Sequence, residues 1–241
     1  MTARVGGGWC IGVVVPARDE AATIAECVAS IQRSYLATAG TNSLWIVVVA
    51  DGCTDDTAAI ARGVIAETGE VIDCAVSCAG AARRLGAEAV LDHFRDQPKN
   101  RLWLANTDAD TRVPDGWLPL HLELAAEGAT AVAGIVMLDV STAGEVVSRL
   151  FRETYRVNAD GSHAHVHGAN LGVRADAYLD VGGWSHTRLA EDHCLWSRLR
   201  RAGWRLISSV RSVVTTSARL EGRAPGGFAD TLRAHVDANG G

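Results

Sequence analysis

The sequence has no excess of positive charge. Its 23 lysine and arginine residues are outnumbered by 28 aspartate and glutamate residues, which gives a formal net charge of −5 at pH 7. Proteins that bind nucleic acids rely on lysine and arginine side chains that neutralise backbone phosphates. The charge balance therefore argues against a nucleic-acid partner, and any phosphate ligand must be bound by local arginines, backbone N–H groups or a metal ion.

The sequence also lacks the segments that would place it across a membrane or outside the cell. No stretch approaches the roughly 18 apolar residues of a transmembrane helix, and the N-terminus has no hydrophobic run of signal-peptide length. The six cysteines include no C-x-x-C pair, so we expect reduced thiols rather than zinc ligands or disulfides. We expect a cytoplasmic protein without a transmembrane segment, and leave peripheral attachment to a membrane open.

Hydrophobic residues make up 48% of the sequence, and in its first half they repeat one pattern. A continuous apolar run, typical of a strand buried on both faces, is followed each time by a segment with helical spacing. The runs are residues 11–15, which Pro16 is expected to end in a turn, 44–50 and the weaker 71–76. Strands alternating with helices predict an α/β fold with a doubly wound, mainly parallel sheet, whose ligands bind beyond the carboxyl ends of the strands.

Two acidic residues follow the next apolar run, residues 102–105. Asp108 and Asp110 are two positions apart, and alternate residues of an extended chain point to the same side, so we expect the two carboxylates to converge at a strand end. Like charges that close repel unless a cation lies between them or one takes a proton. A hard divalent ion with oxygen ligands is the simplest explanation, and a helix cap or turn is the alternative.

The second half of the chain is less repetitive. It predicts strands at residues 129–138 and 205–216, an amphipathic helix at 145–156, a short helix after Arg174 and a helix through Leu195 and Leu199. Three histidines, His163, His165 and His167, lie between these elements. His165 and His167 have the spacing of a metal pair on a strand, but no third ligand matches them, so we interpret them as a polar rim.

Six short motifs, taken in order, resemble those of family 2 glycosyltransferases with the GT-A fold. They are VPARDE at residues 15–20, ADGCTDDT at 50–57, TDAD at 107–110, G-x-N-x-x-x-R at 168–174, GGW at 182–184 and ED at 191–192. Each motif alone is weak, but their order and spacing are specific, and the resemblance covers nearly the whole chain. It implies one GT-A domain over residues 1–241, with a nucleotide-binding half at 1–111 and an acceptor-binding half at 112–241.

The resemblance implies an enzyme that uses a nucleotide-diphosphate sugar and a divalent metal, Mg²⁺ or Mn²⁺, to glycosylate an acceptor hydroxyl. The acceptor itself, whether a small molecule, a glycan or a lipid-linked group, does not follow from it. Two departures affect the metal and the nucleotide pocket. Asp19 stands where asparagine is frequent, and the segment after residue 210 has no clear histidine to complete a metal shell.

Roles for the nucleotide side follow from the same resemblance. Asp51 resembles the carboxylate that accepts hydrogen bonds from the base, and we expect it in an open cleft. Pro16, Ala17 and Glu20 resemble the pocket edge around base and ribose. Arg83 is a candidate contact for ribose or phosphate, with a solvated helix face as the alternative. Asp108 would lie nearer the ribose and Asp110 would bind the metal.

Roles for the acceptor side centre on the acid pair at residues 191–192. An acceptor hydroxyl is a poor nucleophile until its proton is removed, and the resemblance assigns that task to Asp192, with in-line attack and inversion. Glu191 would orient the sugar or the loop. Trp184 and Asn170 are candidates for the sugar or acceptor cleft, and core packing is the alternative for Trp184.

Other functions fit parts of the sequence. A haloacid-dehalogenase-like phosphatase would need threonine at the fifth position of its Asp-x-Asp motif, where this chain has Arg112. A nucleotidyltransferase would usually have a glycine-rich basic loop after the first strand, where this chain has Pro16 and two acids. A non-catalytic nucleotide-sugar-binding homologue would not need both Asp110 and Asp192. A retaining glycosyltransferase of similar fold stays open.

Overall fold

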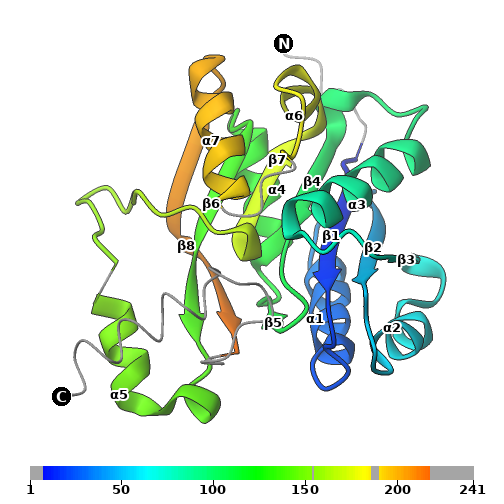
Figure 1. The fold of residues 1–241 in the computed structure, drawn as a ribbon. Helices are drawn as coiled ribbons and strands as arrows, with labels where there is room; N and C mark the ends of the chain where they lie inside the picture. The colour runs from blue at the N-terminus through cyan, green and yellow to red at the C-terminus, as the bar shows by residue number, and fades with distance from the viewer. Residues whose placement is uncertain (1–7, 154, 186–189, 218–241) are drawn as a thin grey trace.

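The computed structural model describes residues 8–153, 155–185 and 190–217 of the chain, and these form one sheet packed between helices (Figure 1). The elements of the first half are β1 (Cys10–Ala17), α1 (Ile24–Leu36), β2 (Ser43–Asp51), α2 (Thr57–Ile65), β3 (Gly69–Cys74), α3 (Ala79–His93) and β4 (Leu102–Asn106). Those that follow are β5 (Thr111–Arg112), α4 (Trp117–Ala126), β6 (Ala131–Leu138), α5 (Val140–Glu153), β7 (Leu171–Arg174), α6 (Ala175–Asp180), α7 (Glu191–Arg201) and β8 (Leu206–Thr216).

The eight strands lie in the order β3-β2-β1-β4-β7-β6-β8-β5. β3, β2, β1 and β4 are parallel neighbours, and β6 runs parallel to β8, while β7 is antiparallel to both β4 and β6. The prediction of an α/β fold with a mainly parallel sheet is therefore confirmed. The antiparallel β7 separates the two parallel groups, so the carboxyl ends of β1, β2 and β4 share one edge.

Helices cover both faces of the sheet. α1, α2 and α4 contribute to one hydrophobic cluster, and α3, α6 and α7 contribute to the other. Alternate strand residues divide between the clusters: Val13 and Val15 pack on the first side and Val14 on the second. This burial on both faces explains the continuous apolar runs in the sequence, because no position of a central strand faces water.

Two predicted boundaries were wrong. β1 does not end in a turn at Pro16, because Pro16 and Ala17 still lie in register with Val49 and Ala50 of β2. The amphipathic helix ends at Glu153, three residues before its predicted end. α5 also begins earlier than predicted, but Gly144 has φ 74° and ψ 160°, which breaks the helix near its start. Glycine tolerates that left-handed φ without the steric cost that a side chain would add.

No helix in the described ranges is both long enough and apolar enough to cross a membrane.

Candidate active site

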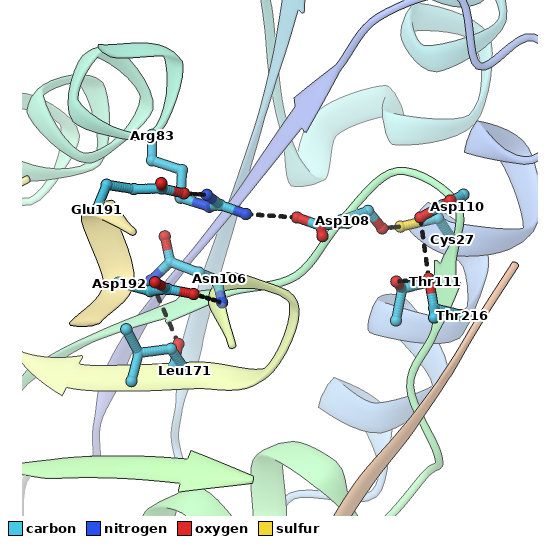
Figure 2. Close-up of polar contacts among 11 residues, drawn as sticks. Cys27, Arg83, Asn106, Asp108, Asp110, Thr111, Leu171, Glu191, Asp192 and Thr216 are labelled. Atoms are coloured by element: carbon cyan, nitrogen blue, oxygen red, sulfur yellow. Dashed lines mark hydrogen bonds and ion pairs between the residues drawn. The ribbon is translucent and has the colours of Figure 1, made fainter. Parts of the chain in front are cut away.

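The first acid pair lies in a turn and not in a strand. β4 ends at Asn106, and the N–H of Thr111 donates to the carbonyl oxygen of Asp108 at 3.0 Å, which closes the turn. The turn interrupts the alternation of an extended chain, so the two carboxylates do not converge as we expected. Asp108 points toward Arg83 and Asp110 points toward Thr216 (Figure 2).

Arg83 lies between the two acid pairs of the site. Its side chain is 5% exposed, Nη2 lies 2.6 Å from Oδ1 of Asp108, and Nη1 pairs with Oε1 of Glu191. The guanidinium also lies 5.5 Å from the ring centre of Trp184. The alternative of a solvated helix face is therefore wrong. Arg83 joins the turn after β4 to the start of α7 (Figure 2).

Close packing places Arg83 at this position. α3 lies against β1, and a Cβ added to Gly86 would come within 2.5 Å of Cγ1 of Val14. A Cβ on Gly168 would come within 2.5 Å of Cζ of Arg83. Only glycine fits at such distances, so both the helix that carries Arg83 and the segment that covers it approach more closely than other residues would allow.

The second acid pair forms the first turn of α7. Glu191 is 8% exposed and turned toward Arg83, whereas Asp192 is partly exposed. Oδ2 of Asp192 accepts the N–H of Gly168 at 2.9 Å, and Oδ1 accepts the N–H of His193 at 2.7 Å. These bonds fix the orientation of Asp192. They also leave lone pairs on both oxygens, because each carboxylate oxygen can accept two hydrogen bonds.

The charges around Arg83 do not balance. Burial lowers the pKa of Arg83, but the carboxylates of Asp108, Glu191 and Asp192 outweigh that effect and raise it overall. Burial raises the pKa of Asp108, and the neighbouring Arg83 opposes the shift. One guanidinium among the three carboxylates leaves an excess of negative charge around Arg83. Such a surplus favours binding of a cation.

Asp110 presents its carboxylate beside hydroxyl groups. Oδ1 of Asp110 accepts the hydroxyl of Thr216 at 3.1 Å, and the hydroxyls of Thr111 and Thr216 lie 3.0 Å apart. Thr216 ends β8, 106 residues from Asp110 along the chain, so sequence reasoning missed it. Carboxylate and hydroxyl oxygens are hard donors, which fits Mg²⁺ or Mn²⁺ better than a soft metal.

Within the described residues, Asp110 belongs to no group of three acidic, histidine or thiol ligands close enough to share an ion. The group that does lie that close is Asp19, Cys53 and Asp55. Its carboxylates join two loops: Oδ1 of Asp19 accepts the N–H of Thr54 at 2.6 Å, and Oδ2 of Asp55 accepts the N–H of Ala21 at 3.1 Å. An ion at Asp110 can take further oxygens from a ligand, as Mg²⁺ commonly does from phosphates.

The nucleotide-side residues gather at the ends of β1 and β2. Pro16 and Ala17 are the last residues of β1, next to Ala50, and Asp51 ends β2. Asp51 is not in an open cleft: it is 6% exposed and accepts the N–H of Ser77 at 2.9 Å and that of Cys78 at 3.2 Å. That expectation was wrong because the loop between β3 and α3 folds over the carboxylate.

Glu20 is similarly enclosed. It is 8% exposed, its Oε2 accepts the hydroxyl of Thr23 at 3.0 Å, and its N–H donates to Oγ1 of Thr57 at 2.6 Å. Thr57 begins α2, so the loop after β1 is held to the helix after β2. The structure thus brings Pro16, Ala17 and Glu20 to the strand end that also carries Asp51.

Trp184 and Asn170 lie in the core and line no open cleft. Trp184 is 1% exposed and belongs to the hydrophobic cluster under α3 and α7. Asn170 is fully buried, where its Oδ1 accepts Nε1–H of Trp117 at 2.9 Å and its Nδ2 donates to the carbonyl oxygen of Ile135 at 2.9 Å. Core packing and hydrogen bonding account for both side chains.

Comparisons with known proteins agree with this architecture. The family model described as "Glycosyltransferase like family 2" matches residues 8–234 of the 241. No curated protein matches the sequence.

Several solved structures have the same fold at low sequence identity. The mannosyltransferase PcManGT from Pyrobaculum calidifontis, solved in complex with GDP-Man and Mn²⁺, aligns with a TM-score of 0.60 and 19% identity over 93% of this chain and 68% of its own. TarS from S. aureus aligns with a TM-score of 0.59 and 13% identity over 88% of this chain, which spans only 37% of TarS. A mycobacterial protein aligns with a TM-score of 0.60 and 20% identity over 95% of this chain and 74% of its own.

The family match covers most of the chain, and these neighbours share its curled, mostly parallel sheet between helices. The chain belongs to glycosyltransferase family 2 and has the GT-A fold.

Proposed function

We propose that the protein transfers a sugar from a nucleotide-diphosphate donor to an acceptor hydroxyl, with inversion and with a divalent cation. The nucleotide would bind in the half formed by residues 1–111, against Pro16, Ala17, Glu20 and Asp51, and the acceptor in the half formed by 112–241. The observation that carries the proposal is the bridge from Asp108 through Arg83 to Glu191, because it sets the acid pair after β4 at a fixed position relative to the acid pair of α7.

Asp192 is suited to the role of general base. It is partly exposed, its orientation is fixed by the N–H groups of Gly168 and His193, and it keeps lone pairs free of those bonds. The acceptor hydroxyl would give its proton to Asp192 as its oxygen attacks the anomeric carbon. Attack from the face opposite the leaving diphosphate inverts the configuration of the sugar.

Asp110 is the proposed metal ligand, and Asp108 lies beside it on the same turn. The ion, when bound with the donor, stabilises the negative charge that develops on the leaving diphosphate. Arg83 is a positioning residue in this scheme. Both of its terminal nitrogens are paired with carboxylates, which hold the guanidinium between the two acid pairs.

The solved neighbours support the choice of donor. PcManGT is bound to GDP-Man and Mn²⁺, and residues 1–349 of TarS are bound to UDP. We propose a nucleotide-diphosphate sugar and Mg²⁺ or Mn²⁺ for this chain too. We also propose a cytoplasmic setting, which the thiol form of the cysteines supports.

Thermal shift measurements with UDP-, GDP-, TDP- and CDP-sugars test the donor assignment. A ligand that binds only the folded state raises the melting temperature, by about 5 °C or more at a hundredfold excess over Kd. We expect one nucleotide class to stabilise the protein, and more strongly with Mn²⁺ than with chelator. The proposal is wrong if none of these sugars shifts the melting temperature and none is hydrolysed.

A further inference from the structure

A ring-lined segment lies beside the proposed base. Residues 155–167 lead from α5 to the start of β7 and pass close to the N-terminal end of α7 (Figure 1). The segment reaches Asp192 directly, since the N–H of Gly168 donates to Oδ2 of Asp192 at 2.9 Å. Whatever binds against this segment would therefore lie next to the carboxylate that takes the acceptor proton.

Three rings of the segment contact one another. The rings of Tyr155 and His165 have centres 4.5 Å apart, and those of His165 and His167 lie 6.0 Å apart at an interplanar angle of 15°. The hydroxyl of Tyr155 lies 2.9 Å from Nε2 of His167. We call Tyr155, His165 and His167 the ring wall. His193 follows Asp192 on α7, is exposed, and contributes to the lowered pKa of His165.

Burial keeps the imidazole of His167 neutral near pH 7. It lowers the pKa of His167 to about 4, and it also lowers the pKa of His165. The hydroxyl oxygen of Tyr155 accepts the N–H of Val136 at 3.0 Å and lies beside Nε2 of this neutral ring. These contacts fix the positions of the two rings relative to each other.

Neutral rings select a particular kind of ligand. The neutral imidazole of His165 offers one donor and one acceptor, and a sugar hydroxyl can use both. Phosphates and carboxylates only accept hydrogen bonds, and proteins usually bind them with arginine or lysine. Aromatic faces also pack against the apolar faces of a flat ligand. The composition of the ring wall therefore fits an uncharged polyhydroxy ring better than an anionic head group.

We propose that Tyr155, His165 and His167 form an acceptor subsite for a neutral sugar ring, so that the acceptor is a carbohydrate. This inference rests on the proposed glycosyl transfer. An acceptor hydroxyl, oriented by the ring wall, would form the new glycosidic C–O bond. The bond between the anomeric carbon and the diphosphate oxygen would break with its electron pair leaving on the diphosphate, and the hydroxyl proton would pass to Asp192.

The test uses the full chain with the nucleotide sugar that it hydrolyses and two acceptor panels. One panel holds methyl glycosides of common hexoses, and the other holds polyprenyl phosphates in detergent. We expect transfer to at least one methyl glycoside, with His165→Ala raising KM for that glycoside about tenfold or more and changing kcat less than KM. Tyr155→Phe keeps the ring but loses the bond to His167, so its effect should be smaller.

His93→Ala is the matched control. The His93 ring also stacks on an aromatic side chain, with its centre 3.8 Å from that of Trp45, but it is exposed at the end of α3. This variant should leave the acceptor KM unchanged. Arg156→Ala tests the anionic alternative, because Arg156 follows Tyr155 and is exposed.

The outcomes separate the inference from the function on which it rests. Donor hydrolysis with inert glycosides and active polyprenyl phosphates, or an acceptor KM that responds to Arg156→Ala and not to His165→Ala, would overturn the ring-wall assignment alone. Failure to bind or hydrolyse any nucleotide sugar would overturn the proposed function, and the acceptor subsite with it.

Discussion

The two acid pairs of the site share one pattern, in which the two acids of a pair have different contacts. In the turn after β4, Asp108 binds Arg83 while Asp110 points away toward Thr216. On α7, Glu191 binds Arg83 while Asp192 is turned away and partly exposed. In each pair, one acid forms an ion pair with Arg83, and its neighbour is the one for which we propose a role in the reaction. Acids of the same short motif can therefore have different tasks, and their partners indicate which.

The largest effect should come from the outer acid of α7. Asp192→Asn keeps the shape of the side chain but cannot take a proton, so we expect transfer to fall about 10²- to 10⁴-fold with donor affinity nearly intact. Steady-state rates with an acceptor, and calorimetric titration of the donor, measure the two quantities. Wild-type transfer rates in this variant would show that Asp192 is not the base.

Removing Arg83, which contacts one acid of each pair, should lower the free energy of unfolding. Arg83→Ala leaves Glu191, whose side chain is 11% exposed, as a buried charge without its partner, and such a loss typically costs about 3 kcal/mol of unfolding free energy. Urea unfolding measures the change. Arg84→Ala is the control, because the pair of Arg84 with Glu88 is solvent-exposed and should contribute less than about 1 kcal/mol. Equal effects of the two variants would contradict a bridging role.

The outer acid of the first pair should affect binding more than stability. Asp110→Asn removes a charge from the proposed metal ligand, so we expect nucleoside diphosphate to bind about tenfold more weakly in Mn²⁺ and to depend less on that ion. Calorimetry with Mn²⁺ and with chelator gives both values. If wild-type protein binds the diphosphate equally well with chelator, Asp110 does not act through a metal.

The smallest effect should be a pH dependence on the acceptor side. The pKa of His167 is lowered from 6.5 to about 4 by burial, so the unfolded chain binds a proton that the folded chain excludes between those values. Stability from this group is full above pH 6.5 and decreases as the pH falls toward 4, by about 1 kcal/mol at pH 5.5. Urea unfolding at pH 7.5 and 5.5 should show a smaller loss in His167→Gln than in wild type. An equal loss in both proteins would show that His167 does not titrate in this way.

The first half of the fold could be predicted because its signals are local. Buried parallel strands require continuous apolar runs, and the helices between them show their own spacing. The acid pair was placed at the correct strand end, but the turn that starts after Asn106 was not foreseen, so Asp108 and Asp110 were expected to point the same way. The sequence of a buried strand does not indicate at which residue its hydrogen bonding to the neighbouring strands ends.

The site partners were beyond sequence reasoning because they are distant along the chain. Arg83 and Glu191 are 108 residues apart, and no spacing rule relates them. The enclosure of Asp51 by the N–H groups of Ser77 and Cys78 could not be predicted either, because any non-proline residue supplies a backbone N–H and the residue types therefore do not identify the donors. Trp184 and Asn170 were named as cleft residues from a motif, while burial gives them roles in the core.

The central claim is that one acid of each pair stabilises the fold while its neighbour takes part in the reaction. It is tested most directly on α7. Glu191→Gln and Asp192→Asn make the same chemical change at adjacent positions, and each variant can be measured both for urea unfolding and for transfer rate. The account predicts that Glu191→Gln loses the larger part of the stability, because Arg83 loses a charged partner, and that Asp192→Asn loses the larger part of the rate with nearly unchanged stability. If both variants lost stability and transfer rate in the same proportion, that result would contradict the account.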